Sequence, residues 1–565
     1  MTTGVALREL LPSRADYAGI GRSWPRDLAA GVTVGIVALP LALAFSVATG
    51  VGAAPGLVTA VIAGAVAAVF GGSHLQVSGP TGAMTVVLIP LVAQHGRGVI
   101  YPVAVLAGLM ILLGALLRVG RLLAYIPWPL VEGFTVGIAV VIAAQEVPNA
   151  LGIAKPQVQN ATAAAAVAGL RFVEHPHWSV VGLLALTVVL TAGLPRLHRS
   201  LPASLIAIFV VTVVAAVGGA HVARLGALPS RLPTPSFPDL SGTGALLAPA
   251  LIVAFLAALE SLLSAQVADG MSDRPRYSPD RELFGQGLAN IASGIGGGMP
   301  ATGAIARTAV NARAGAHTRV AALTHAVVLA VIVYTASGLV GRIPLVALAG
   351  VLLVTAVRMV ERRNVRAVWT STKGDALVFA VTAVGTVAFD LVHAVAAGLL
   401  VAGVLALTHL ASTAHAVAEP LPEGIDDVEE HALLSRHVLV YRVDGPLFFA
   451  AAARFLHELT ASADVRVVIL RLSSLDLLDA TGGRALGEIV TQMAARHVTV
   501  LLKGARPNHL RLLTSVGTLQ PVVAQGHVFT DLDAALTHAA RHVARDLHPA
   551  PEPSLDVLVP FAGSL

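Results

Sequence analysis

The chain is 565 residues long, and 56% of its residues are hydrophobic while only 12% are charged. This composition, with a mean hydropathy of +0.79, excludes a soluble enzyme and predicts a polytopic membrane protein. The net charge of +5 does not indicate nucleic-acid binding, because the arginines are spread over short loops instead of forming one basic face. The absence of cysteine excludes disulfides, thiolate metal sites and cysteine nucleophiles.

Apolar tracts recur along most of the chain, from Leu28 to Leu410, after a hydrophilic arm over residues 1–26. Since one spanning helix needs about 20 apolar residues, the region 27–417 predicts about a dozen spans, or about 14 with short, broken ones. If the N-terminus is cytoplasmic, basic residues concentrate after even-numbered spans. The positive-inside rule then predicts a multi-pass protein of the plasma (inner) membrane with both termini in the cytoplasm.

A short motif occurs twice between apolar stretches, as SGPTGA at residues 78–83 and as MPATGA at residues 299–304. Proline suits the first turn of a helix, and glycine and alanine leave the backbone N–H groups accessible. Each helix N-terminus carries about half a positive charge, so two half-helices aimed at one point can hold a small anion. Small residues in membranes ordinarily serve close helix packing, but the duplication favours an anion site.

Glu260 is an ionisable residue in the middle of an apolar helix, where an unpaired carboxylate costs a few kcal/mol or more. Ser264 lies one turn further on the same face, so the two groups could share a proton or ligate a sodium ion. Arg307 lies about 7.5 Å along a helix from Thr302, where it raises the potential near an anion. The structural alternative is an ion pair between Glu260 and Arg307.

No other metal centre is predicted, because the histidines considered lack a convincing metal-ligand spacing: His74, His95, His175, His177 and His325.

After residue 417 the composition changes, and an acidic, proline-bearing linker is predicted over residues 418–434. A second domain is predicted over residues 435–547, followed by an unstructured tail over residues 548–565. Strands alternate there with amphipathic helices, which predicts a small α/β domain. The expected segments, alternately strand and helix, are 438–443, 449–461, 465–472, 484–496, 498–502 and 532–546.

Several motifs in this order resemble the SulP inorganic anion transporters, a family that includes prestin and cyanobacterial bicarbonate transporters. The resemblance covers nearly the whole chain. It rests on DLAAGVTVGIVALP (27–40), GGS (71–73), GPTGA (79–83), ESLLS (260–264), REL (281–283), QGLAN (286–290), PATGAIAR (300–307) and DATG (479–482).

The resemblance implies an all-α polytopic membrane domain of about 14 spans, built as two inverted repeats of seven, in which a core domain moves against a gate domain. It also implies a small cytoplasmic α/β STAS domain at the C-terminus and a homodimer. By position, the family's anion site maps onto Leu41, Phe45, Thr81, Gly82, Ala83, Thr302, Gly303, Ala304, Ile305, Ala306 and Arg307.

Some residues depart from the family pattern. Many relatives have glutamine where this chain has Leu41, and prestin-like members have serines where it has Ala304 and Ala306. Because these departures remove polar side chains from the predicted site, the anion would be coordinated mainly by backbone amides. In bicarbonate-transporting relatives an aspartate and a threonine match Glu260 and Ser264 and resemble a sodium site.

Thr481, in the DATG motif, matches a phosphorylated serine of STAS-bearing anti-sigma-factor antagonists and is a predicted phosphosite. The alternative is that Thr481 only caps the helix that follows.

The sequence therefore predicts a secondary active transporter of a small inorganic oxyanion, with sulfate as the leading substrate and bicarbonate close behind, coupled to H⁺ or Na⁺. No enzymatic chemistry and no cofactor beyond the coupling ion are expected. The alternatives are an uncoupled anion channel, a chloride/anion exchanger, or a membrane-anchored sensor whose STAS domain binds a cytoplasmic partner.

Overall fold

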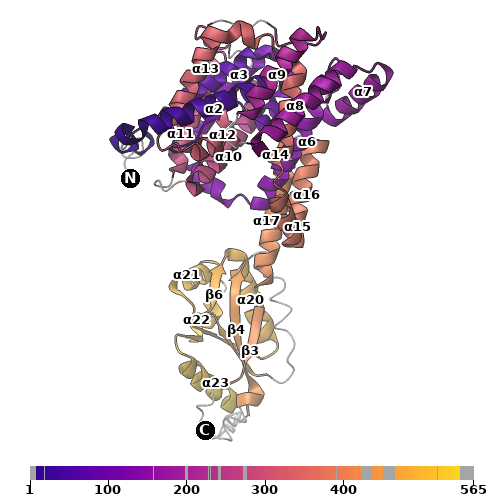
Figure 1. The fold of residues 1–565 in the computed structure, drawn as a ribbon. Helices are drawn as coiled ribbons and strands as arrows, with labels where there is room; N and C mark the ends of the chain where they lie inside the picture. The colour runs from indigo at the N-terminus through magenta and orange to yellow at the C-terminus, as the bar shows by residue number, and fades with distance from the viewer. Residues whose placement is uncertain are drawn as a thin grey trace, which may run out of the picture. The chain divides into compact units, whose positions relative to one another are not determined.

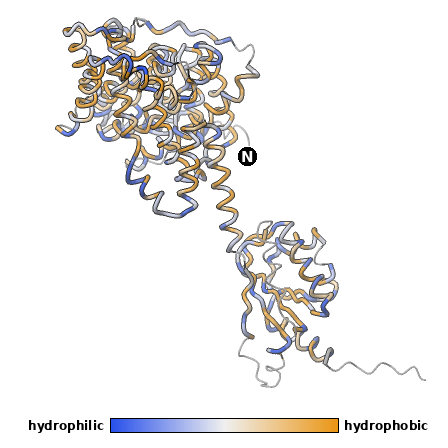
Figure 2. Tube along the Cα trace, turned by 90° about the vertical axis from the view of Figure 1, so that its right-hand side faces the viewer, coloured by the Kyte–Doolittle hydropathy of each residue, from blue (hydrophilic) through white to orange (hydrophobic). Residues whose placement is uncertain are grey.

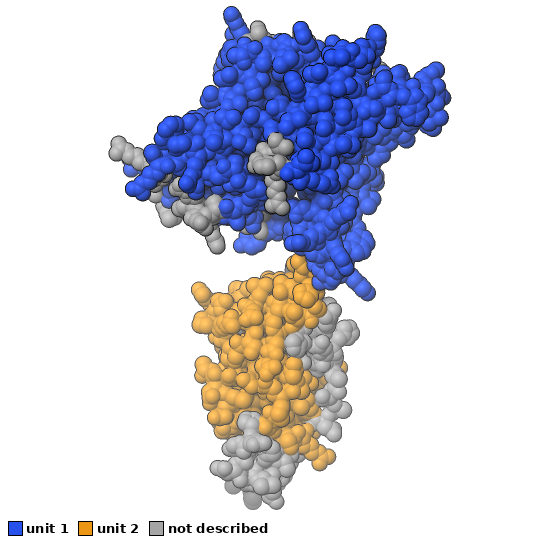
Figure 3. Space-filling view, viewed as in Figure 1, with its two compact units in different colours: residues 1–402 blue, residues 403–565 orange. Residues whose placement is uncertain are grey.

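A computed structural model describes residues 8–17, 20–156, 158, 160–197, 202–226, 228, 231–239, 243–271, 277–389, 391–413, 415–421, 434–448, 465–517 and 520–547. The chain divides into two compact units, residues 1–402 and residues 403–565 (Figure 3). The first unit is helical, and the second contains a β-sheet with helices on it (Figure 1).

The first unit is built from a succession of helices, and the longest connection between them lies between α9 and α10. They are α2 (Ile20–Ala48), α3 (Ala54–Phe70), α4 (Gly82–His95), α5 (Ile100–Leu116), α6 (Trp128–Leu151), α7 (Ala161–Glu174), α8 (Trp178–Leu197), α9 (Ala203–Val217), α10 (Leu247–Gly270), α11 (Pro279–Ile295), α12 (Ile305–Arg313), α13 (Arg319–Val340), α14 (Leu345–Met359), α15 (Arg362–Thr370), α16 (Lys373–Ala388) and α17 (Leu391–Ser412), which runs on into the second unit. Short 3₁₀ segments lie at Arg14–Tyr17 (η1), Arg97–Val99 (η2), Val119–Tyr125 (η3) and Thr243–Leu246 (η4).

Seven of the described helices are long and apolar enough to cross a membrane, and α3, α4 and α9 are shorter apolar helices. Most of these helices consist mainly of hydrophobic residues, and hydrophilic residues are concentrated in the connections between them (Figure 2). Large apolar side chains such as Leu113, Phe209 and Leu400 are exposed on helix surfaces. In water such faces would be costly, whereas a lipid bilayer solvates them, as expected for a polytopic membrane domain.

Small residues let the central helices approach closely. A Cβ atom on Gly31 of α2 would lie only 2.4 Å from the carbonyl oxygen of Ala321 in α13. In the same way, a Cβ atom on Gly108 of α5 would lie 2.6 Å from the carbonyl oxygen of Gly287 in α11. Because lipid gives no hydrophobic drive between helices, this close packing helps to hold α2 to α13 and α5 to α11.

The second unit is a six-stranded sheet in the order β3-β4-β5-β7-β8, with β6 paired to the far end of β4. Only β3 is antiparallel to its neighbour among the described pairs of this sheet. The strands are β3 (His415–Glu419), β4 (Val438–Leu447), β5 (Val467–Arg471), β6 (Leu475–Leu478), β7 (Thr499–Lys503) and β8 (Val528–Phe529), and the helices are α20 (Ala480–Ala495), α21 (Pro507–Ser515), α22 (Gln520–Ala524) and α23 (Leu532–Leu547).

Both faces of this sheet are buried, as parallel strands require. Alternate residues of β5 point to opposite sides. Val468 and Leu470 join the core beneath α20, α21 and α22, and Val467 and Ile469 join the core beneath α23.

The sheet differs from the sequence prediction at its edges. Strand β3 crosses the predicted end of the membrane region at residue 417, and its last residue, Glu419, belongs to the predicted linker 418–434. Strands β6 and β8 and helices α21 and α22 were not predicted, because segments this short carry little periodicity. The predicted helix at 449–461 and tail at 548–565 lie outside the described residues.

Candidate functional site

The two copies of the repeated motif meet at the centre of the first unit. Ser78–Gly79 (β1) and Thr302–Gly303 (β2) form an antiparallel pair in which Ser78 faces Gly303 and Gly79 faces Thr302. The N–H of Ala304 donates to the carbonyl oxygen of Val77 at 2.9 Å and extends this pairing. The motif copies, far apart in the sequence, thus form one crossing.

A helix begins directly after each strand of the crossing. Thr81 is the N-cap of α4 and Ala304 is the N-cap of α12, and neither accepts a side-chain capping hydrogen bond. Alanine has no side chain that could cap, and the hydroxyl of Thr81 donates instead to Oε2 of Glu260 at 2.8 Å. The first-turn N–H groups of both helices therefore lack the usual capping partner and are suited to bind an anion.

Arg307 crosses from α12 to the other motif copy. Its side chain is 2% exposed, its Nη2 donates to the carbonyl oxygen of Pro80, and its Nη1 has no hydrogen-bond partner among the described residues. A Cβ atom on Gly79 would lie 2.5 Å from this Nη1, so only glycine admits the guanidinium here. A buried cation with a free donor raises the positive potential at the crossing.

Glu260 and Arg307 interact electrostatically, yet no ion pair within 4.0 Å joins these two described residues. The carboxylate of Glu260 accepts a hydrogen bond from Thr81 instead. Ser264 is not joined to Glu260 by a hydrogen bond, because its hydroxyl contacts that of Thr308 in α12 at 2.9 Å. The two residues of the predicted coupling pair, Glu260 and Ser264, therefore bind different segments: Glu260 binds Thr81 before α4, and Ser264 binds Thr308 in α12.

The remaining predicted residues differ in exposure. Phe45 lies close to the start of α4, since a Cβ atom on Gly82 would lie 3.4 Å from its ring and 2.4 Å from Ile142 of α6. Leu41 lies one turn earlier on α2. The buried members of the predicted site are Leu41, Phe45, Thr81, Gly82, Ala83, Thr302, Gly303, Ala304 and Arg307, whereas Ile305 and Ala306 are exposed.

Polar residues of α11 hold the crossing in place. Nδ2 of Asn290 donates to the carbonyl oxygen of Ala301 at 2.9 Å, and Oδ1 of Asn290 accepts from the N–H of Ala301 at 2.8 Å. Nε2 of Gln286 donates to Oγ of Ser78 at 2.5 Å. These two side chains support both motif copies through hydrogen bonds.

Sequence reasoning missed two further supports. Oγ of Ser261 accepts from the N–H of Gly303 at 3.0 Å, and Nδ2 of Asn311 donates to the carbonyl oxygen of Leu75 at 2.8 Å. Ser261 follows Glu260 directly, and Asn311 lies one turn beyond Arg307. The sequence contained a signal for both residues, because a polar side chain within a membrane helix is costly unless it has a partner.

In the second unit, Asp479 is the N-cap of α20, and its Oδ1 accepts from the N–H of Gly482 at 2.7 Å. The idea that Thr481 caps this helix is therefore wrong. Thr481 lies exposed in the first turn, where it stays a predicted phosphosite. The sequence analysis also did not predict the cluster formed by His527, His538 and His542.

Two broken helices that start at one crossing, beside buried charged groups, are typical of transporters built from internal repeats. The chain belongs to the sulfate permease family, which residues 25–382 match, and residues 432–535 match the STAS domain. The family consists of transporters and not of enzymes, so this chain is a multipass membrane transporter with a C-terminal STAS domain.

Relatives support anion transport as the family's activity. The chain is 33% identical to YvdB of Bacillus subtilis (strain 168), whose name assigns it provisionally to sulfate transport, over 91% of this chain and 97% of that protein. It is 29% identical to the bicarbonate transporter BicA of Synechocystis, over 92% of this chain and 94% of that protein.

The fold is also similar to that of solved structures. The transmembrane domain of a cyanobacterial bicarbonate transporter, BicA, matches with a TM-score of 0.60 and 30% identity over 67% of this chain and 97% of that chain. The overall structure of SLC26A9 matches with a TM-score of 0.82 over 96% of this chain and 94% of that chain, and at 16% identity it shows the fold alone.

Proposed function

We propose that this protein is a secondary active transporter of a small inorganic oxyanion, with sulfate as the leading substrate and bicarbonate second. The observation that carries the proposal is the meeting of two uncapped helix starts, α4 and α12, beside the buried and incompletely paired guanidinium of Arg307. The names of the relatives, which include both sulfate and bicarbonate transporters, support the same pair of substrates.

The charges at the crossing suit a small anion. Each helix start supplies about half a positive charge, and Arg307 adds a full one, against the single negative charge of Glu260 when it is ionised. Ala83, Ala304 and Ala306 offer no polar side chain, so backbone N–H groups would make most of the contacts. Selection would then depend on size and charge rather than on side-chain hydrogen bonds.

We further propose that Glu260 couples transport to a cation gradient, with H⁺ favoured over Na⁺. Glu260 accepts a hydrogen bond from Thr81, the residue at which α4 begins. Protonation of Glu260 would remove a negative charge beside the anion and strengthen anion binding, and anion binding would favour protonation equally. A sodium site would need more oxygen ligands, and the nearest predicted one, Ser264, is engaged with Thr308.

The test is uptake of labelled sulfate and labelled bicarbonate into proteoliposomes under imposed H⁺ or Na⁺ gradients. Glu260→Gln keeps an oxygen that can accept from Thr81 but cannot carry a proton, and the matched control is Glu361→Gln, on the exposed start of α15. We expect gradient-driven uptake by the wild type and the control, whereas Glu260→Gln transports anion without responding to the gradient.

Each other outcome contradicts a defined part of the proposal. Unchanged gradient dependence in Glu260→Gln removes Glu260 from the coupling. Flux that ignores every gradient in the wild type indicates a channel or an exchanger. The absence of flux for both anions refutes the substrate class and favours the sensor, in which the STAS domain would carry the output.

We also propose that both termini lie in the cytoplasm and that the protein is a homodimer, as basic-residue placement and family resemblance imply. Because the chain has no cysteine, a single cysteine introduced at Thr481 can be labelled without background. Labelling of intact cells by a membrane-impermeant reagent would contradict the cytoplasmic placement.

A further inference from the structure

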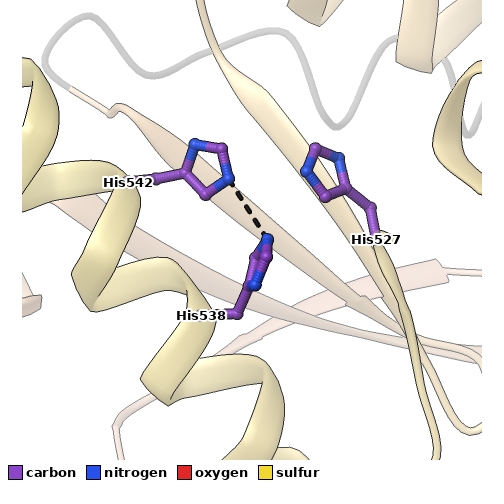
Figure 4. A group of neighbouring side chains, drawn as sticks. All are labelled: His527, His538 and His542. Carbon is purple, nitrogen blue, oxygen red and sulfur yellow. Dashed lines mark hydrogen bonds between the residues drawn. The ribbon is translucent and has the colours of Figure 1, made fainter. Parts of the chain in front are cut away.

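Three histidines of the second unit lie together. His527 immediately precedes β8, and His538 and His542 lie one turn apart on α23. The three rings converge in Figure 4, and one nitrogen of each lies within 4.8 Å of one nitrogen of both others. Nε2 of His538 and Nε2 of His542 are 3.2 Å apart.

We propose that His527, His538 and His542 bind one divalent transition-metal ion of the zinc class. In tetrahedral zinc sites each Zn–N bond is about 2.0–2.1 Å, which places two ligand nitrogens about 3.3 Å apart. The separation of 3.2 Å between the two nitrogens on α23 is close to this value. Small rotations of the His538 and His542 side chains would bring their nitrogens to the same distance from a nitrogen of His527.

The backbone fixes His527 firmly. Its side chain is 5% exposed, its N–H donates to the carbonyl oxygen of Val522 at 2.9 Å, and its carbonyl oxygen accepts from Leu502 at 2.8 Å. His538 and His542 are half-buried, which leaves an ion a path from solvent. One rigid ligand and two adjustable ligands on a helix are a suitable arrangement for a metal site.

Burial, together with the neighbouring His542 and His538, lowers the pKa of His527 to about 4. Without a metal, the same rings could form a packed group, since their centroids are 4.9–5.3 Å apart. The experiment must therefore separate a metal site from simple ring packing.

The donors define the class of metal. Three imidazoles suit Zn²⁺, Ni²⁺, Cu²⁺ and Co²⁺, whereas Mg²⁺ and Ca²⁺ prefer oxygen ligands. Arg541 and Arg545 on the same helix interact electrostatically with His538 and oppose cation binding. An ion at this position would join α23 to the edge of the sheet at β8.

The test uses the full-length protein, purified in detergent with a histidine-free tag and stripped of metal by a chelator. Zn²⁺ is titrated in competition with a chromophoric chelator, and bound zinc per chain is measured after dialysis. The variants are His538→Gln and His542→Gln, and the matched control is His497→Asn, which replaces an exposed histidine of the same unit. All four proteins are compared by circular dichroism and gel filtration.

We expect the wild type and His497→Asn to bind one more zinc ion per chain than either cluster variant, or to bind it at least 100-fold more tightly. Zn²⁺ should also raise the unfolding temperature of the first two proteins only, because a ligand that binds the folded state stabilises it. The wild type loaded with Co²⁺ should show the strong visible absorption of a tetrahedral site.

Equal zinc content and affinity in the wild type and both cluster variants would overturn the proposal and leave ring packing as the role of the cluster. The cobalt spectrum keeps the test decisive if a cluster variant fails to fold. A weak, octahedral spectrum in the wild type would contradict a tetrahedral histidine site. None of these readouts depends on anion transport.

Discussion

Replacement of Asn290 by alanine should destabilise the crossing of the two broken helices. Asn290 and Ala301 are both fully buried. The side chain of Asn290 makes three hydrogen bonds, two with the backbone of Ala301 and one, at 2.8 Å, with the carbonyl oxygen of Gln286. Alanine removes all three and leaves the N–H and C=O groups of Ala301 without these partners in a dry interior.

The size of the effect follows from these bonds. Leaving the buried N–H and C=O groups of Ala301 unpaired costs about 1–3 kcal/mol each, or about 2–6 kcal/mol in total. We therefore expect Asn290→Ala to lower the free energy of unfolding by about 2–6 kcal/mol.

The assay is denaturant unfolding in mixed micelles, with anion uptake measured in parallel. The matched control is Asn160→Ala, which removes the N-cap of α7, where Asn160 Oδ1 accepts from the N–H groups of Thr162 and Ala163. Because that cap is exposed, its loss should cost only about 1 kcal/mol. If Asn290→Ala costs no more than Asn160→Ala, the support that we assign to α11 is refuted.

Two further predictions concern charged groups outside the membrane spans. Burial alone would raise the pKa of Asp16, but hydrogen bonds from Arg281 and Ser13 outweigh it and hold this pKa well below its usual range. Asp16→Asn should therefore lower the free energy of unfolding by about 3 kcal/mol at pH 7. When unfolding is measured against pH, the difference between wild type and variant should narrow only below about pH 4, where the carboxylate becomes protonated in the unfolded chain. A difference that disappears at pH 6 would contradict the assignment. Glu419→Gln removes two partly exposed ion pairs, which join β3 to β4 and to β5. It should lower the free energy of unfolding by about 1 kcal/mol at low salt and by less in 1 M salt. A loss of stability that does not depend on salt would exclude an electrostatic cause.

The crossing could be anticipated from the sequence because its signal is local. Proline, glycine and small residues between apolar tracts mark a broken helix, and the duplication of that pattern marks a repeat. The pairing of Ser78 with Gly303 could not be anticipated, since no local property states which strand meets which. The partner of Glu260 was missed for the same reason, because Thr81 lies on another helix.

The histidine cluster illustrates a different limit. The spacing of four between His538 and His542 places both on one face of a helix and was visible in the sequence. His527, however, joins them only because β8 lies next to β7 at the sheet edge and brings the preceding loop over α23. Short strands such as β8 carry almost no pattern of their own, so the third ligand depends on tertiary structure.

Helix α10 links the two half-helices into one body. Glu260 accepts from Thr81 at the start of α4, Ser261 accepts from Gly303 in β2, and Ser264 contacts Thr308 in α12. A displacement of α10 must therefore carry both motif copies with it.

Helix α6 contacts the same crossing in a different way. Ile142 packs against Gly82 at the start of α4, and no hydrogen bond joins α6 to α4 or α12 among the described residues. Apolar packing without directional bonds resists sliding far less than a polar network does. The physical division between a moving body and its support should thus run between α4 and α6, and the anion site would lie on the moving side.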